Sequence, residues 1–167
     1  MTTITLNIPL SSFLQKYLTK KYGTEHDVNR RTWFGRYIID LLDKNYRKSN
    51  VDLKKDSFYP VHVSSAIIKE VGFDMSATKL KLLEEMINKV FLNDLYSYIN
   101  VSMGNELKFH NARHNSINKQ NATQAIAQFL KFYDIHESEL CQDSVYRNFN
   151  RVRKSDKNEL LKKVSTS

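Results

Sequence analysis

Apolar residues between Leu80 and Leu95 recur at intervals of three and four positions. This spacing places them along one face of an α-helix. Asp74 or Ser76 can cap the start of that helix, and Gly104 ends it. A helix of about 28 residues is ~40 Å long at 1.5 Å per residue. The run therefore predicts a helix that is long enough to form the backbone of a domain.

The composition also favours helices. The chain has 167 residues, of which 41% are hydrophobic, and it contains only four Gly and two Pro. Nine Phe, nine Tyr and one Trp exclude a disordered chain, which would carry fewer aromatic residues. We expect a mainly α fold of the α+β class, with a short N-terminal strand followed by about five helices.

The N-terminal segment predicts the strand. Residues Thr3–Ile8 alternate strictly between polar and apolar side chains, and Pro9 ends the pattern. Because side chains alternate across a strand, Thr3, Thr5 and Asn7 share the polar face.

Capping residues and helical spacing divide the rest of the chain. The expected helices run from Ser11 or Ser12 to Gly23, from Arg30 and Arg31 onwards, from Ser64 to Gly72, over Thr123–Tyr133, and from Ser144, capped by Asp143, to Lys154. Phe58–Val63 can form a second short strand, which Pro60 restricts to a sheet edge. The sequence leaves open whether this strand pairs with the first one.

Polar segments separate three parts of the chain. Residues 1–48 are expected to form a strand–helix–helix unit, 58–104 a central helical core, and 121–167 a C-terminal helical pair with a basic tail. The linker 48–57 and a polar loop, 105–121, are expected to connect them.

The formal net charge of +8 is concentrated at the two ends of the chain. Residues 1–48 contain nine Lys and Arg against four Asp and Glu, and residues 144–167 contain seven against two. The stretch between them contains ten against twelve. Two basic ends around a near-neutral middle predict two contact surfaces for a polyanion, of which nucleic acid is the commonest in a cell.

The order of elements in residues 3–47 resembles a ribbon–helix–helix DNA-binding domain: a short strand, a proline, a helix, a glycine turn and a second helix with a basic start. The resemblance implies that two copies pair their strands into a ribbon that enters the major groove of double-stranded DNA. It also implies contacts from the outward strand side chains and from the start of the second helix. These are Thr3, Thr5 and Asn7 for base edges, and Arg30 and Arg31, with the backbone from Asn29 to Thr32, for a phosphate.

Elementary chemistry agrees with those roles. Asn can pair with adenine through two hydrogen bonds, and Thr can contact a thymine methyl group. A helix N-terminus presents N–H groups and a positive dipole end to a phosphate. A lone strand also leaves a full edge unpaired unless a second copy covers it, which predicts a homodimer. The alternative is an ordinary strand that packs on helices of its own chain.

The last expected helix is amphipathic and basic. Its apolar face holds Val145, Phe149 and Val152. Its cationic residues are Arg147, Arg151, Arg153 and Lys154. Together with the helix Thr123–Tyr133 and the turn between them, it has the outline of a helix–turn–helix whose last helix faces phosphates. The alternative is a solvated charged face.

Several segments are similar to small uncharacterised proteins of Bacteroidetes phages and mobile elements. They are the opening Ile8-Pro9, Lys20–Gly23, Phe129–Ile135, Asp143–Arg147 and Arg151–Lys154. The similarity implies a mobile-element origin and supplies no mechanism.

Signals for catalysis are weak. His110 and His114 have the spacing of two metal ligands on a helix, but no Cys or adjacent Glu accompanies them. The carboxylates of Glu84 and Glu85, and of Glu137 and Glu139, come with no nucleophile, glycine-rich phosphate loop or zinc motif. We therefore expect no enzyme, no cofactor and no metal site.

The single cysteine, Cys141, fits a reducing compartment. No apolar run approaches the ~18–20 residues that span a bilayer, and the first residues lack the features of a secretory signal. A cytoplasmic protein with no membrane contact is expected.

These features together predict a non-catalytic, homodimeric DNA-binding protein of phage or mobile-element type. A repressor, an antitoxin and a mobilisation accessory protein all remain open, as does the target sequence. The helices between residues 64 and 103 would supply the core or a surface for a protein partner. The alternative is a phage structural or host-interaction protein whose basic ends bind a protein.

Overall fold

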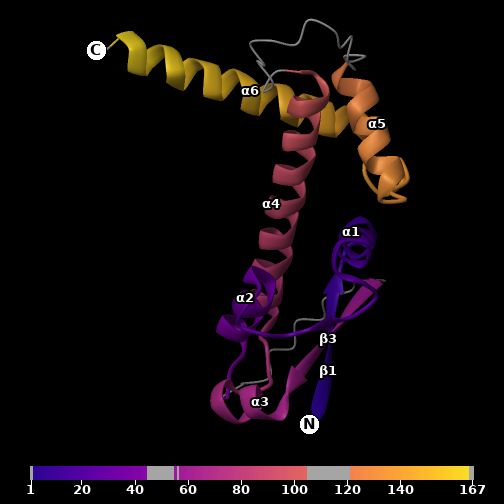
Figure 1. Ribbon diagram of the computed structural model, residues 1–167, viewed down its shortest axis with the longest axis vertical. Helices are drawn as coiled ribbons and strands as arrows, with labels where there is room; N and C mark the ends of the chain where they lie inside the picture. The colour runs from indigo at the N-terminus through magenta and orange to yellow at the C-terminus, as the bar shows by residue number, and fades with distance from the viewer. Residues whose placement is uncertain (1, 45–54, 56, 105–120, 166–167) are drawn as a thin grey trace, which may run out of the picture. The chain divides into compact units, whose positions relative to one another are not determined.

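The computed structural model describes residues 2–44, 55, 57–104 and 121–165, with side chains to Ser155 in the last helix. Figure 1 shows its elements, which are β1 (Thr3–Leu10), α1 (Ser12–Tyr22), β2 (His26–Asp27), α2 (Trp33–Leu41), β3 (Ser57–Ser64), α3 (Ser65–Val71), α4 (Ala77–Ser102), α5 (Ala122–Phe132) and α6 (Gln142–Ser165). The expected α+β class with an N-terminal strand is confirmed. Contacts divide the chain into two units, Met1–Phe91 and Leu92–Ser167, and the boundary falls within α4.

The first unit contains a three-stranded sheet in the order β1-β3-β2. β1 and β3 run side by side and antiparallel, from the pair Thr3 and Ser64 to the pair Leu10 and Ser57 (Figure 1). β2 is parallel to β3. The two strands expected from the sequence therefore pair within one chain, so the premise of a lone strand, on which the intermolecular ribbon and the homodimer were expected, is wrong. β3 covers one edge of β1, and no strand of the described residues pairs with the other edge, which we call the open edge of β1.

The expectation that Pro60 restricts its strand to a sheet edge is wrong, because β3 is central. The N–H of Ser65 donates to the carbonyl of Thr2, and backbone groups alternate in direction along an antiparallel pair. Pro60 lies opposite Asn7, a position where backbone groups of β3 point away from β1. β2 pairs with β3 at Val61 and His62, after Pro60. No hydrogen bond to β1 or β2 is therefore lost because Pro60 has no N–H.

β1 also extends past Pro9, where the pattern predicted its end. Pro9 lies opposite Phe58, and by the same alternation its nitrogen points to the open edge of the sheet. A proline is tolerated at such a position because no ladder hydrogen bond is lost.

One face of the sheet forms the core of the first unit with helices. Tyr59, Val61 and Val63 of β3 are buried with Ile8 and Leu10 of β1. The buried helical residues that belong to this unit include Leu14, Tyr17 and Leu18 of α1, Phe34 and Ile38 of α2, and Leu83, Ile87 and Phe91 of α4. The other face of the sheet carries Thr3, Thr5 and Asn7, all exposed.

The capping signals were correct for two of the shorter helices. α1 follows Ser11 and ends at Gly23. α3 is capped by Ser64, whose hydroxyl accepts the N–H of Ile67, and it ends at Gly72. Gly72 has φ 98° and approaches the backbone so closely that a Cβ would lie 2.2 Å from the carbonyl oxygen of Asp43. Any larger residue at this position would be strained and would clash.

α2 begins later than expected, at Trp33 and not at Arg30. Thr32 is its N-cap and accepts the N–H of Gly35 through its hydroxyl. The residues before it form a turn around the side chain of Asn29, and this turn replaces the first helical turn that the two arginines were expected to make.

The second unit consists of the end of α4 with α5 and α6. α5 starts with a capping box between Asn121 and Gln124. α6 starts at Gln142, before the expected Asp143 cap, and continues to Ser165 through the segment expected to be a tail. No Gly or Pro interrupts this stretch, so nothing in it ends the helix.

Most of the expected linker 48–57 and of the expected loop 105–121 lies outside the described residues. Within the described part of the chain, no helix combines the length and the apolar character that crossing a membrane requires.

Candidate nucleic-acid interface

α6 is held in the second unit by two apolar side chains. Val145 is 2% exposed and Phe149 is 3% exposed, and the ring centroid of Phe149 lies 5.6 Å from that of Tyr96 on α4. Residues four apart share one face of a helix. Val152, expected on the same face, is 43% exposed, so burial of this face is complete only near the start of α6.

The N-terminus of α6 is occupied by carboxylates of the protein itself. Both oxygens of Glu137 accept the N–H of Gln142, at 3.1 and 3.2 Å. Asp143 adds a second negative charge in the first turn. Negative groups stabilise this end of a helix, but they also repel a phosphate. An interface for a polyanion must therefore begin farther along α6.

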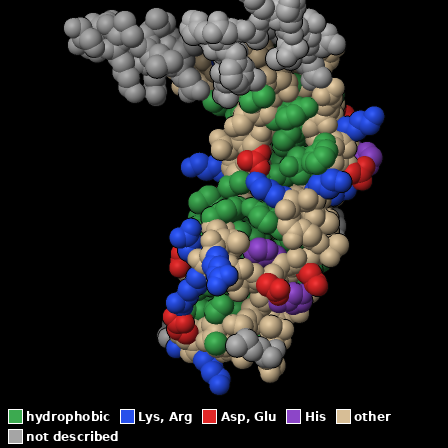
Figure 2. Space-filling model, viewed as in Figure 1, with side chains coloured by type: hydrophobic (Ala, Val, Ile, Leu, Met, Phe, Trp, Pro, Cys, Tyr) green, Lys and Arg blue, Asp and Glu red, His purple; other side chains and the backbone are tan. Residues whose placement is uncertain are grey.

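A cationic row, Arg147, Arg151 and Lys154, follows on α6, and all three side chains are exposed. Their spacing of four and three residues aligns them along one face. Among the side chains described, which end at Ser155 in this helix, none of the three pairs with an acidic group. Figure 2 shows Lys and Arg side chains dispersed among hydrophobic and acidic side chains on the face in view.

The middle residue of this row, Arg151, lies near the phenol of Tyr96. Burial raises the pKa of Tyr96, and the charge of Arg151 partly offsets that rise. The guanidinium of Arg151 is therefore within electrostatic reach of the Tyr96 hydroxyl. Arg153, the fourth expected cation of this segment, is half-buried.

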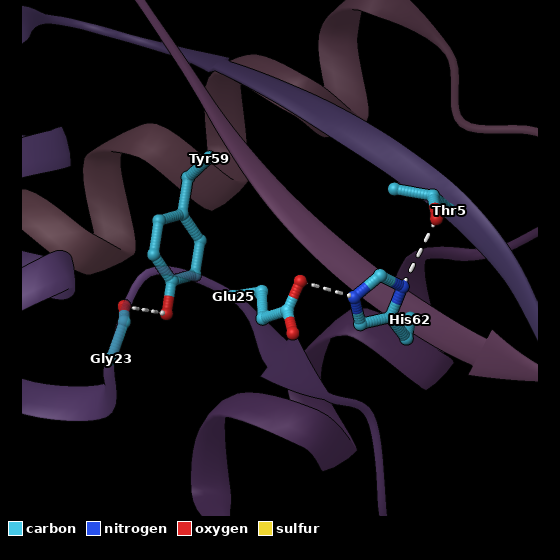
Figure 3. Close-up of polar contacts among 5 residues, drawn as sticks. All are labelled: Thr5, Gly23, Glu25, Tyr59 and His62. Carbon is cyan, nitrogen blue, oxygen red and sulfur yellow. Dashed lines mark hydrogen bonds and ion pairs between the residues drawn. The ribbon is translucent and has the colours of Figure 1, made fainter.

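The expected base-reading side chains of β1 lie on the outer face of the sheet, where one of them has a partner. The Thr5 hydroxyl oxygen lies 3.0 Å from Nδ1 of His62, and Nε2 of His62 lies 3.0 Å from Oε2 of Glu25 (Figure 3). A carboxylate can only accept, so Nε2 carries the proton. With a neutral imidazole, the Thr5 hydroxyl then donates to Nδ1.

This network has two consequences for the ribbon hypothesis. The hydroxyl of Thr5 is bound within the sheet, so a base contact through that hydroxyl would have to replace its hydrogen bond to His62. The carboxylate of Glu25 also lies on the face that a phosphate backbone would approach, and like charges repel.

The expected phosphate clamp before α2 is also engaged. Oδ1 of Asn29 accepts the N–H of Arg31 at 2.9 Å and the N–H of Thr32 at 3.2 Å. The guanidinium of Arg30 pairs with the carboxylate of Glu70, and both side chains are more than half exposed. Such an exposed pair contributes little to stability and is readily exchanged.

A cavity of about 530 Å³ opens beside Arg30. Its charged lining residues are Arg30, Arg36, Asp40 and Glu70. Two cations and two anions give it no net preference for a polyanion, in contrast to α6.

Sequence reasoning missed Tyr146, which is 40% exposed on α6. Helical spacing could have revealed it, because Tyr146, Asn150 and Arg153 follow one another at four and three residues. It also missed the Glu137 cap, since Glu137 was considered only as a carboxylate for acid–base chemistry.

Among the described residues, no three His, Cys, Asp or Glu side chains are grouped to hold a metal ion. His110 and His114 lie outside those residues. Comparison of the chain with protein-family models, with curated proteins and with solved structures gave no match. The arrangement of α6 and of β1 is therefore what the chain offers as a guide to function.

Proposed function

We propose that this protein is a DNA-binding protein that acts as a homodimer, with the cationic row of α6 contacting phosphates of double-stranded DNA. The observation that carries the proposal is the division of α6 into two sides. Burial of Val145 and Phe149 fixes the helix, while Arg147, Arg151 and Lys154 remain exposed on it. Cations presented on a helix fixed in this way can neutralise DNA phosphates and release their counterions.

The dimensions of the row suit a nucleic-acid backbone. Arg147 and Lys154 are seven residues apart, which is about 10 Å along a helix. Phosphates of one DNA strand advance by about 3.4 Å each along the duplex axis, so the row spans about three of them. Arginine also binds phosphate through two parallel hydrogen bonds.

The open edge of β1 supports the dimer. β1 lies at the edge of the sheet, and Thr3–Leu10 contains no charged residue. Ile4 on this strand is 40% exposed. Natural proteins usually protect an edge strand with charges, bulges or a cover. An uncharged, extended edge with an exposed isoleucine is suited to pairing with another strand.

Pairing of two β1 strands has one preferred register. The backbone groups that point to the open edge belong to Thr3, Thr5, Asn7 and Pro9, because the alternate residues bond β3. A two-fold axis at Thr5 pairs Thr3 with the partner's Asn7 and keeps Pro9, which has no N–H, outside the ladder. The same register brings Ile4 beside the partner's Leu6 and covers its exposed surface.

A regulator or accessory factor of a phage or mobile element is the role that DNA binding and the sequence resemblance favour. The role rests on the DNA contact, which can be tested directly. Two triple variants of equal charge should be compared in their binding to a fluorescein-labelled mixed-sequence duplex by fluorescence anisotropy. They are Arg147→Gln with Arg151→Gln and Lys154→Gln, and the control Lys69→Gln with Lys81→Gln and Lys89→Gln, whose lysines are exposed on α3 and α4.

The α6 variant should lose at least about tenfold in affinity, since three phosphate contacts are removed. The control should lose less, because only the overall charge changes. Equal affinities of the wild type and both variants would remove α6 from the interface. The basic ends would then be assigned to contacts with a protein partner.

A further inference from the structure

A second row on α6 carries an exposed aromatic ring. Tyr146 is 40% exposed, and no ring of another described residue is stacked on it. Asn150 and Arg153 follow it at four and seven residues and are both half-buried. Residues at these spacings are neighbours on a helix. A phenol ring, an amide and a guanidinium therefore form one stripe, which we call the Tyr146 stripe.

The stripe lies in a purely cationic stretch of α6. Between Ser144 and Ser155 the helix has four cations and no acidic residue. On this helix Tyr146 directly precedes Arg147, the first residue of the cationic row. An exposed ring beside a row of cations is complementary to a ligand that offers both flat aromatic surfaces and negative charges.

We infer that the Tyr146 stripe holds unpaired nucleobases, so that the protein binds single-stranded nucleic acid more tightly than the duplex of the same sequence. This inference rests on the proposed function, because the cationic row supplies the phosphate contacts. In a duplex the base faces are stacked on one another and are closed to a side chain. In a single strand each base offers a face on which an aromatic ring can stack, whatever its sequence.

Each residue of the stripe has a distinct role in this complex. The ring of Tyr146 is the stacking platform. The amide of Asn150 can donate to and accept from the edge of the stacked base. The guanidinium of Arg153 can bind the adjacent phosphate or stack on the next base. These contacts explain why a helix that binds a polyanion exposes a large ring to water.

The test compares one fluorescein-labelled oligodeoxynucleotide of about 20 nucleotides, its duplex and an RNA of the same sequence. Binding is measured by fluorescence anisotropy at low salt. The wild type should bind the single strands more tightly than the duplex. Tyr146→Ala should weaken single-strand binding roughly tenfold and change duplex binding by less than about twofold, whereas Tyr146→Phe should retain the wild-type affinities.

Phe58→Ala is the matched control, because Phe58 is also a ring exposed to solvent, 51% in its case, but lies on β3. It should leave all affinities unchanged. Tighter binding of the RNA than of the single-stranded DNA would indicate a further contact to the ribose 2′-hydroxyl. Equal binding of these two strands would indicate contacts to bases and phosphates only. Both results support the inference.

Equal binding of single strand and duplex, with no effect of Tyr146→Ala on either, would overturn the inference and leave the phosphate contacts of α6 intact. Binding of neither form at low salt would overturn the inference together with the proposed function.

Discussion

The hydroxyl oxygen of Thr5 and Nδ1 of His62 lie 3.0 Å apart and join β1 to β3 across 57 residues of sequence. Glu25 extends the contact on the other side of the imidazole. Thr5, which the ribbon–helix–helix resemblance implies as a base reader, is thus part of a polar network with His62 and Glu25 on the outer face of the sheet.

Thr5→Val tests which role this side chain has. The change keeps the branched shape and removes the hydroxyl, so it should lower the free energy of unfolding by about 0.5 to 1 kcal/mol, the typical value of one hydrogen bond. Affinity for a mixed-sequence duplex should not change. Thr3→Val, on the same exposed face, is the control for stability. A loss of DNA affinity in Thr5→Val without a loss of stability would support base contact by β1.

Ile4→Lys tests the open edge of β1 as the dimer interface. Ile4 is 40% exposed, so the monomer should tolerate the lysine, but a paired β1 would bring its charge against the partner's Leu6. Sedimentation velocity should show a dimer for the wild type and a monomer for the variant. Leu82→Lys, at an apolar residue of α4 with 44% exposure, should remain dimeric. A wild-type monomer at all concentrations would contradict pairing through β1.

The ionised carboxylate of Glu84 makes the free energy of unfolding depend on pH in the acid range. Burial alone would raise the pKa of Glu84, but hydrogen bonds from Lys55 and from Ser11 outweigh it and lower the pKa below 4.5. A depressed folded pKa stabilises the protein above the unfolded pKa, and this contribution is lost as the pH falls through the folded value.

Glu84→Gln should therefore destabilise the protein by about 1 to 2 kcal/mol near neutral pH, and by less below about pH 4. Glu85→Gln, at the exposed neighbouring position, is the control and should behave as the wild type. Urea unfolding at both pH values measures the difference. Equal unfolding free energies of Glu84→Gln and the wild type near neutral pH would show that the hydrogen bonds of Glu84 with Lys55 and Ser11 are not stabilising.

His26 gives a second dependence on pH. Its Nε2 is buried without a hydrogen-bond partner among the described residues, and its ring lies 5.5 Å from that of Tyr22 and 5.2 Å from that of Phe34. Burial lowers the pKa of His26 below 6.5, and Asp27 partly offsets the shift. The unfolded chain therefore takes up this proton first as the pH falls.

Stability should decline from about pH 6.5 down to the lowered folded pKa and then level off with respect to this group. His26→Phe keeps the aromatic contacts and removes the titrating group. Its free energy of unfolding should therefore fall less than that of the wild type between about pH 7 and 5.5. Urea unfolding over this range is the measurement. An unchanged decline in His26→Phe would mean that other groups cause it.

Local signals were sufficient for the elements that depend on local chemistry. The Ser64 and Gly72 boundaries were predicted because caps act within one helical turn. Ser11 precedes α1 as expected, although its side chain makes no capping hydrogen bond. β2 was missed because it has two residues and no alternation, and it exists only through its pairing with β3. The edge position predicted from Pro60 was wrong because the direction of its nitrogen depends on the register with β1, which the sequence does not reveal.

The candidate site also combines features that local sequence determines with features that only tertiary contacts determine. The division of α6 into apolar and cationic sides was predictable, because it follows from helical spacing within one element. The partners of Thr5 and Arg30 were not, because His62 and Glu70 are 57 and 40 residues away in sequence. Only the fold brings these groups together.

The salt dependence of duplex binding tests the central claim most directly. Each phosphate contact contributes about 0.9 to the slope of log K against log salt concentration. The wild type should show a steep slope, and the variant with Arg147, Arg151 and Lys154 changed to Gln should show one that is lower by about 2 to 3. Identical slopes for the two proteins would contradict the assignment of α6 as the surface that contacts phosphates.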